Sequence, residues 1–190
     1  MRIIAGTWRG RVLANVGKGD PGAHLRPTTD RVRESLFNML AGGRFGDPFE
    51  GAHVLDLFAG TGALGLEALS RGAVSAVFVD DGRKAQSLIK ENLQLLRCET
   101  ERVITRDATR LPPCDTERAT LVFLDPPYGK GLGDKALSAA VKGDWLAEGA
   151  LVVWEENAPQ IAPEGFTRLD ARRYGDTHVT VLRFEGMADL

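Results

Sequence analysis

The feature that most constrains the fold is a regular alternation of buried strands and amphipathic helices that begins near residue 52. Five short apolar runs have the length of strands: 53–57, 74–79, 102–105, 120–124 and 150–154. Helical periodicity fills three of the gaps between them, at 63–71, 86–96 and 137–145. Strands and helices that alternate in this way are typical of a parallel sheet covered by helices.

The last two strand-like runs depart from this alternation. Residues 166–174 and 177–184 are separated only by Gly175 and Asp176, which predicts an antiparallel hairpin rather than another strand–helix unit. The sequence therefore predicts an α/β fold with a seven-stranded, mostly parallel sheet that ends in an antiparallel C-terminal hairpin.

The first 44 residues have a different composition. They carry eight Lys and Arg against three Asp and Glu, a net charge of +5, so the remainder must sum to −7 in a chain of net charge −2. Alternating residues predict a small β-hairpin at 2–13, and a stripe of Val32, Leu36 and Leu40 predicts a helix. We expect residues 1–44 to form an extension and residues 45–190 the main domain. A basic arm suits a polyanionic partner, but a solvated charged face explains the same pattern equally well.

Several protein classes do not fit this chain. No apolar run approaches the roughly 20 residues that span a bilayer, and the first residues lack the layout of a signal peptide. Cys98 and Cys114 do not have the spacing of metal ligands. We therefore expect a reduced cytoplasmic setting, no membrane, no metal and, since nothing in the sequence calls for a dimer, a monomer.

A glycine-rich loop follows the first predicted strand, in the run Asp56-Leu-Phe-Ala-Gly-Thr-Gly62. Glycines there allow backbone angles and a close approach that a Cβ would forbid. Because Gly60, Gly62 and Gly65 also match a dinucleotide fingerprint, the loop alone does not choose between NAD and another nucleoside cofactor.

Acidic residues follow the next two predicted strands as well. Asp80 stands where a carboxylate can accept the hydroxyls of a ribose, and Asp107, beside Ala108, where one can accept an adenine amino group. Helix capping and loop solubility are the alternative explanation for each acid taken singly. Three acids at successive strand ends, together with the glycine loop, favour a site for an adenosine.

The fourth predicted strand ends in Asp125-Pro-Pro-Tyr128, which we call the acceptor lip. Pro126 and Pro127 have no N–H, so the lip offers carbonyl and carboxylate acceptors rather than donors. The Asp125 carboxylate and the Pro126 carbonyl can accept the two hydrogens of an amino group, and Tyr128 can stack on the base that carries it. A stiff turn with a packed tyrosine is the alternative, and the nearby cofactor loop argues against it.

These motifs together resemble a class I S-adenosylmethionine-dependent methyltransferase, which has a Rossmann-like fold. More closely, the chain resembles the RsmD family, which methylates the N2 amine of a guanine in bacterial small-subunit (16S) ribosomal RNA, at the guanine-966 type of site. The resemblance covers nearly the whole chain. It rests on four sequence motifs: Arg2-Ile-Ile-Ala-Gly with Arg9-Gly-Arg11, Arg26-Pro-Thr-Thr-Asp-Arg-Val-Arg-Glu-Ser-Leu-Phe37, the motif from Asp56 to Gly65, and the lip.

The resemblance implies a role for each matching residue. Asp56 and the loop of Phe58, Ala59, Gly60, Thr61 and Gly62 would hold the methionine and ribose end of S-adenosyl-L-methionine, which the segment from Thr28 to Arg33 would close over. Asp80 would bind the ribose, and Asp107 with Ala108 the adenine. Asp125, Pro126, Pro127 and Tyr128 would hold the target guanine. Arg2, Arg9, Arg11 and Arg26 would contact ribosomal RNA, either naked or in a 30S particle, and no site residue is assigned to the C-terminal hairpin.

Three rival functions remain open at this stage. A DNA or RNA adenine-N6 methyltransferase would use the same loop and lip, but usually needs a separate target-recognition domain. A nucleotide-dependent oxidoreductase would explain the glycines but would leave the lip without a role. A non-catalytic RNA-binding module would not need the acceptors Asp80 and Asp125.

Overall fold

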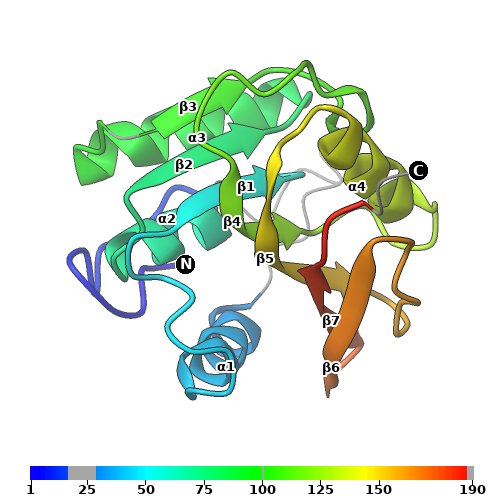
Figure 1. Cartoon of the computed structure of the whole chain (residues 1–190). Helices are drawn as coiled ribbons and strands as arrows, with labels where there is room; N and C mark the ends of the chain where they lie inside the picture. The colour runs from blue at the N-terminus through cyan, green and yellow to red at the C-terminus, as the bar shows by residue number, and fades with distance from the viewer. Residues whose placement is uncertain (17–28, 100, 188–190) are drawn as a thin grey trace.

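The computed structural model describes residues 1–16, 29–99 and 101–187, which form one sheet flanked by helices (Figure 1). The strands are β1 (His53–Leu57), β2 (Ser75–Val79), β3 (Glu101–Ile104), β4 (Ala119–Leu124), β5 (Leu146–Glu156), β6 (Phe166–Tyr174) and β7 (Thr177–Phe184). The helices are α1 (Asp30–Ala41), α2 (Ala63–Ser70), α3 (Arg83–Leu96) and α4 (Leu132–Lys142), with a short 3-10 helix, η1 (Ala108–Arg110).

The sheet has the strand order β3-β2-β1-β4-β5-β7-β6. Strands β1 to β5 pair in parallel, whereas β7 is antiparallel to both β5 and β6 and lies between them. The predicted fold is thus confirmed, including the antiparallel hairpin. The strand order reverses between β1 and β4, and ligands of open α/β sheets bind outside the carboxyl ends of the strands at such a reversal.

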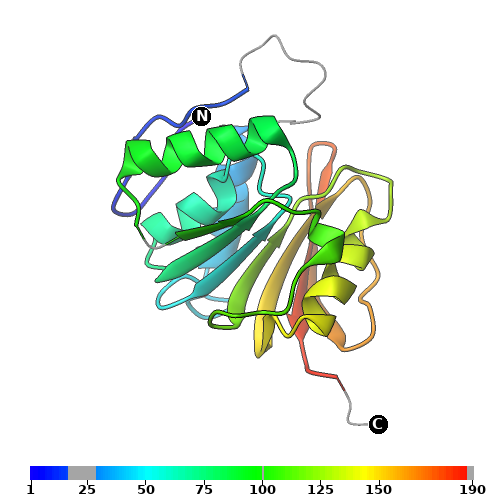
Figure 2. The same cartoon turned by 90° about the horizontal axis from the view of Figure 1, so that it is seen from above.

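Alternate side chains of each strand enter two separate cores. Helices α1, α2 and α3 cover one face of the sheet and α4 covers the other, as Figure 2 shows. In β4, Leu121 and Phe123 face the three helices, and Phe123 contacts the ring of Phe37 from α1 at 5.6 Å between centroids. Val122 and Leu124 of the same strand face α4. A sheet covered on both faces explains why its strands are continuous apolar runs in the sequence.

The basic N-terminal segment, residues 1–14, docks onto α2 as an ordered arm. Its chain reverses so that Arg2 and Val12 form an isolated bridge, which is less than the two-stranded hairpin that the sequence predicts. Glu67 of α2 is fully buried and accepts the N–H groups of Ile4, at 2.8 Å, and Ala5, at 3.1 Å. The arm is therefore part of the folded body.

Two close contacts complete this docking. Gly6 has a φ of +80°, and a Cβ built there would lie 1.7 Å from the carbonyl oxygen of Ser70, so this position requires glycine. Asn92 of α3 is fully buried and exchanges hydrogen bonds with both backbone groups of Ala14, at 2.7 and 3.2 Å. The same side-chain amide donates to the carbonyl of Thr61 at 2.9 Å, which joins the arm to the glycine loop.

Three predicted elements have boundaries that are wrong by three residues or more. Helix α3 begins at Arg83 rather than at residue 86. Helix α4 spans Leu132–Lys142 instead of 137–145, and Trp145 lies after it with its indole N–H donating to the Pro112 carbonyl at 2.7 Å. Strand β5 begins at Leu146 rather than 150, because its pairing with β4 shifts register between Ala119 and Leu121.

Candidate active site

The predicted cofactor loop and the acceptor lip meet at the reversal of strand order. The loop leaves β1 after Leu57 and the lip leaves β4 after Leu124, and these two residues are partners in the sheet. The Asp125 N–H donates to the Leu57 carbonyl at 3.4 Å, so the lip runs directly beside the start of the loop. Asp56, the loop and Asp125 are therefore brought together.

The glycine loop has the backbone conformation that its composition predicts. Phe58, Gly60 and Gly62 all have positive φ, of 59°, 59° and 79°, which is strained for the phenylalanine. Asp56, 1% exposed, accepts the N–H of Gly65 at 3.0 Å. A Cβ on Gly65 would lie 2.5 Å from the Phe78 ring, so glycine lets α2 approach β2 closely. The loop thus ends at a helix N-terminus that faces the strand ends.

Asp80 and Asp107 lie at the ends of β2 and β3, as predicted. Asp80 accepts the N–H groups of Gly60, at 2.9 Å, and Gly82, at 2.8 Å, so it braces the glycine loop. Asp107 caps η1 by accepting the N–H and hydroxyl of Thr109, each at 2.8 Å. The capping role weighed in the sequence is therefore present for Asp107. All of its bonds use one carboxylate oxygen, and in the described part of the chain the other accepts none.

The acceptor lip presents its oxygens to the site. Asp125 and Tyr128 are half-buried, Pro126 is buried and Pro127 is exposed. Among the described residues no donor bonds to the Asp125 carboxylate or to the Pro126 carbonyl, so both acceptors are available. The Tyr128 hydroxyl lies 3.2 Å from the hydroxyl oxygen of Thr177 at the start of β7. The C-terminal hairpin, to which the sequence assigned no site residue, thus orients the tyrosine.

Glu156, at the end of β5, is a second site residue that sequence reasoning missed. It is 4% exposed and accepts the N–H of Gly129, the residue after Tyr128, at 3.2 and 3.3 Å, and the N–H of Asn157 at 2.9 Å. The signal in the sequence was an acidic pair, Glu155 and Glu156, directly after a buried strand. The same signal had identified Asp80, Asp107 and Asp125, which follow β2, β3 and β4.

The site is strongly electronegative. Burial raises the pKa of Asp56 well above its usual range, and the charges of Asp125 and Asp80 raise it further, against the Gly65 N–H, which lowers it. Burial also raises the pKa of Asp80. Burial and the neighbouring Glu156 raise the pKa of Asp125 to about 7. In the described part of the chain no Lys or Arg forms an ion pair with any of these three carboxylates, so a bound cation would be stabilised there.

Comparison with known proteins identifies the family. The family model described as Conserved hypothetical protein 95 matches residues 1–183. The protein named Ribosomal RNA small subunit methyltransferase D of Haemophilus influenzae is 37% identical over 182 residues, 92% of this chain and 89% of that protein. Its namesake from Escherichia coli K12 is 40% identical over 163 residues, 86% of this chain and 78% of that one. The chain belongs to the RsmD family.

Solved structures agree with this family and with the class I methyltransferase fold. The structure of yhhF from Escherichia coli has a TM-score of 0.79 at 35% identity and covers 98% of this chain and 99% of its own. The structure of HI0767 from Haemophilus influenzae has a TM-score of 0.76 at 33% identity, covering 97% and 98%. The RsmD-family chain is thus a methyltransferase with a Rossmann-like fold, and the predicted resemblance is confirmed.

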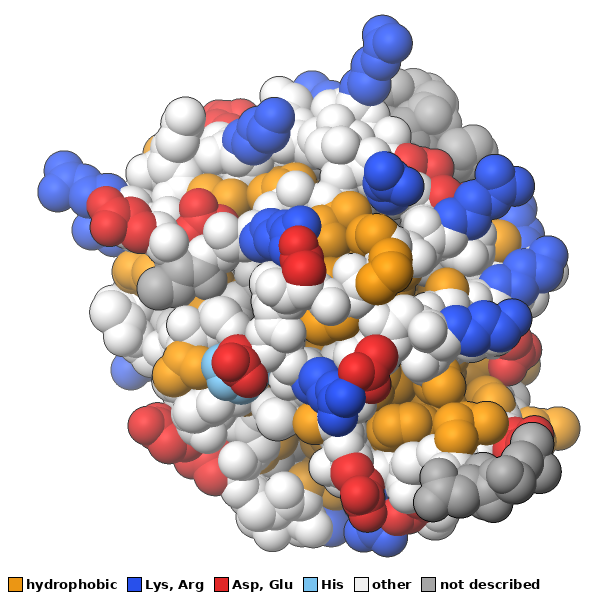
Figure 3. Space-filling model, turned by 45° about the horizontal axis from the view of Figure 1, so that its top comes forward, with side chains coloured by type: hydrophobic (Ala, Val, Ile, Leu, Met, Phe, Trp, Pro, Cys, Tyr) orange, Lys and Arg blue, Asp and Glu red, His pale blue; other side chains and the backbone are white. Residues whose placement is uncertain are grey.

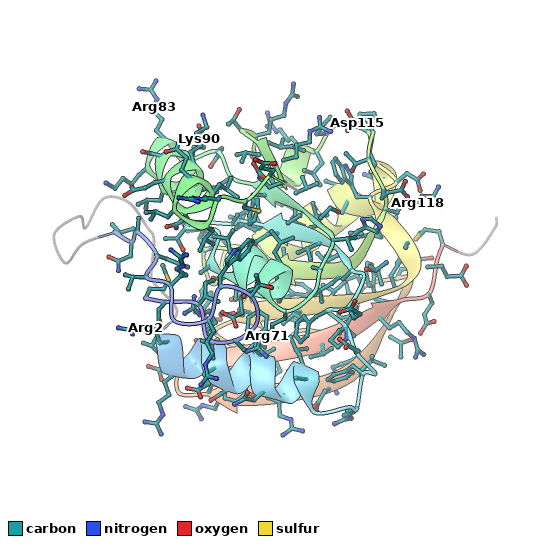
Figure 4. The ribbon with its side chains drawn as sticks, turned by 90° about the vertical axis from the view of Figure 1, so that its left-hand side faces the viewer. Arg2, Arg71, Arg83, Lys90, Asp115 and Arg118 are labelled. Atoms are coloured by element: carbon teal, nitrogen blue, oxygen red, sulfur yellow. The ribbon has the colours of Figure 1, made fainter. Side chains whose placement is uncertain are left out.

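Three of the four arginines predicted to contact RNA lie on the docked arm. Arg2, Arg9 and Arg11 are exposed, and within the described residues none of them forms an ion pair. In Figure 4, Arg2 lies on the same side of the view as Arg83 and Lys90 of α3. In Figure 3, Lys and Arg side chains project at the rim of the face and also occur in its middle, beside acidic and apolar side chains. Arg26 and Thr28 lie outside the described residues.

Within the described ranges, no group of three or more His, Cys, Asp and Glu side chains is arranged to hold a metal ion. Among those same residues, no helix is both long and apolar enough to span a membrane.

Proposed function

We propose that this chain transfers a methyl group from S-adenosyl-L-methionine to the exocyclic N2 amine of a guanine in bacterial small-subunit ribosomal RNA, at the guanine-966 type of site. The observation that carries the proposal is the meeting of glycine loop and acceptor lip at one reversal of strand order, in a chain whose relatives are named Ribosomal RNA small subunit methyltransferase D. The lip offers paired hydrogen-bond acceptors for an amino group, for which an oxidoreductase would have no use.

The residues at the ends of β1 and β2 fit the cofactor. Asp56 and the loop from Phe58 to Gly62 would hold the methionine and ribose end, and Asp80 can accept the ribose hydroxyls while it braces Gly60. The free oxygen of Asp107 would meet the adenine amino group beside Ala108. When bound, S-adenosyl-L-methionine supplies an electrophilic methyl group on a cationic sulfonium. The carboxylates of Asp56, Asp80 and Asp125, which form no ion pair with any described residue, match that charge.

The lip would hold the amine that attacks. An exocyclic amine is a weak nucleophile because its lone pair is delocalised into the ring. The Asp125 carboxylate and the Pro126 carbonyl accept its two hydrogens, which raises electron density on nitrogen and fixes its direction. Tyr128, fixed by Thr177, would stack on the base. Positioning of this kind can supply roughly 7–11 kcal/mol of a barrier.

The arm would bind the RNA backbone. Arg2, Arg9 and Arg11 are free to form bidentate pairs with phosphates. Because an enzyme that modifies a base needs it unstacked, we infer a guanine presented by a loop of the folded RNA rather than one inside a helix. We also infer that the chain acts as a cytoplasmic monomer.

The test is methyl transfer from labelled S-adenosyl-L-methionine to small ribosomal subunits that lack the modification, with naked 16S RNA and duplex DNA in parallel. Nucleoside analysis should recover the label as N2-methylguanosine from one RNA position, and the comparison of substrates reveals whether the particle or the naked RNA is preferred. Label in N6-methyladenosine or in DNA would overturn the guanine assignment.

A variant of the lip tests the site itself. Asp125→Ala should abolish transfer, whereas the affinity for S-adenosyl-L-methionine measured by calorimetry at pH 8 should change less than about threefold. Glu148→Gln, which changes an exposed acid at the other end of β5, is the matched control and should transfer at the wild-type rate. Surviving turnover in the Asp125 variant would refute the assignment of the lip.

A further inference from the structure

The backbone that follows the acceptor lip is held by one buried carboxylate. Glu156 accepts the Gly129 N–H with both of its oxygens, at 3.3 and 3.2 Å, and the Asn157 N–H with one of them, at 2.9 Å. Both carboxylate oxygens of Glu156 thus accept peptide N–H groups. The backbone directly after the lip is therefore fixed by this side chain.

Asp125 interacts electrostatically with Glu156 of β5, Asp56 of β1 and Tyr128 of the lip. The other titratable residues beside these groups are Glu155, the neighbour of Glu156, and His178, the strand partner of Glu156 in β7. Over the described ranges, no ion pair neutralises Asp125 or Glu156. Asp125 is thus a carboxylate in an electronegative setting, which makes it a better proton acceptor than an ordinary aspartate.

We propose that Glu156 is a positioning residue of the acceptor site: it fixes the turn after Tyr128 and, through its charge, makes Asp125 the acceptor of the proton that the target amine loses. The inference rests on the proposed function. As the N2 lone pair forms a bond to the methyl carbon, the methyl–sulfur bond breaks and its electron pair stays on sulfur. The nitrogen then carries a surplus proton, which passes to the Asp125 carboxylate and from there to water.

The two halves of this role can be separated by substitution. Glu156→Gln removes the charge but keeps a carbonyl oxygen that can accept the Gly129 N–H. Glu156→Asp keeps the charge but shortens the side chain by one carbon, so it cannot reach the same N–H. Glu148→Gln on the same strand is again the control, since Glu148 is exposed and lies far from the lip.

The first experiment is the pH profile of kcat for methyl transfer by the three variants and the wild type. In Glu156→Gln the acidic limb should move to lower pH by about one unit, because a neighbouring negative charge has been removed. In Glu156→Asp the limb should stay in place while kcat falls at least tenfold. An unmoved limb in the glutamine variant, or full wild-type kcat in the aspartate variant, would overturn the proposal.

The second experiment does not depend on activity. The side-chain carboxyl carbon of Asp125 is titrated by NMR in the cofactor-free protein, and its midpoint should be lower in Glu156→Gln than in the wild type and the control. An equal midpoint in all three would refute the electrostatic half, even if Glu156→Gln were inactive. If the wild type transferred no methyl group to RNA yet its Asp125 midpoint fell in Glu156→Gln, the proposed function would fail while the coupling of the two acids stood.

Discussion

Replacing Gly6 by alanine should release the N-terminal arm from α2. Gly6 and Gly10 lie in the same segment with nearly equal φ, +80° and +82°, and differ in what an added Cβ would meet. At Gly6 it would lie 1.7 Å from the Ser70 carbonyl oxygen and 2.3 Å from the carbonyl carbon. At Gly10 no atom lies within 4 Å. Gly10→Ala is therefore a matched control that carries the backbone strain alone.

The magnitude follows from the contacts that must break. A left-handed φ costs an alanine roughly 1–2 kcal/mol at either position. The clashing atoms belong to the backbone of Ser70, the last residue of α2, and cannot move aside as a side chain could. In the Gly6 variant the arm must therefore move away from Ser70. It then loses three hydrogen bonds: Thr7 N–H to the Ser70 carbonyl at 2.8 Å, Trp8 N–H to the Ser70 hydroxyl at 2.9 Å, and that hydroxyl to the Ala5 carbonyl at 2.6 Å. At roughly 0.5–1.5 kcal/mol for each bond, the total is roughly 3–6 kcal/mol, limited by the free energy with which the arm docks.

Two assays read out this loss. Urea unfolding gives the free energy for both variants, and hydrogen exchange of the Thr7 and Trp8 amides reports on docking of the arm alone. We expect fast exchange in Gly6→Ala, near-native exchange in Gly10→Ala, and weaker RNA binding for the first variant because Arg2, Arg9 and Arg11 lose their fixed positions. A Gly6 variant within about 0.5 kcal/mol of the Gly10 variant would show that the close approach to Ser70 does not hold the arm.

Three further predictions concern charge. Affinity for S-adenosyl-L-methionine should weaken by up to about tenfold per unit as pH falls through the pKa of Asp56, which burial raises, because a bound cation favours the ionised form of that carboxylate, and calorimetry should find a smaller dependence for the uncharged sulfur of S-adenosylhomocysteine. The raised pKa of Asp56 means that the folded state holds its proton more tightly than the unfolded state, so this contribution to stability is lost as pH rises above about 4. The variant Asp56→Asn keeps an amide oxygen that can accept the Gly65 N–H. In calorimetry its melting temperature should therefore exceed that of the wild type, and the difference should be larger at pH 8 than at pH 4.5. The same variant should bind the cofactor poorly. The double change of Arg9 and Arg11 to Glu should reduce the slope of log affinity against log salt by about 1 or more for small-subunit RNA, and an unaltered slope would place the RNA surface elsewhere.

Local patterns were sufficient for most of the sheet but not for α4. Its helical stripe was read from Leu137 onward, whereas the helix begins at Leu132. Gly133 interrupts the stripe because a Cβ there would lie 2.3 Å from the Trp154 ring, so the helix needs a small residue where the pattern calls for an apolar one. The constraint comes from a strand 21 residues away (154 − 133), and a local window cannot detect it.

Local sequence patterns likewise predicted some residues of the candidate site and missed those that long-range contacts position. The acids at the carboxyl ends of β1 to β4 were found because each lies at or shortly after the end of a strand-like run, and the parallel sheet then brings those ends together. Glu156 and Thr177 were missed because they act through the pairing of β5 with β7 and through contacts with Gly129 and Tyr128, 27 and 49 residues away in the sequence. The arm was recognised as basic, but its attachment to Glu67 and Asn92 depends on contacts 62 to 78 residues apart.

That attachment sets an order on folding. Glu67 and Asn92 are the groups that satisfy the backbone of Ile4, Ala5 and Ala14, so the arm has no binding surface until α2 and α3 have packed on the sheet. Contacts of such long sequence separation form late, because the loop they close must first lose its conformational freedom. The segment that begins the chain is thus expected to be among the last to assemble. Until it does, Ile3 and Leu13, both buried in the finished core, stay exposed to other chains and to chaperones.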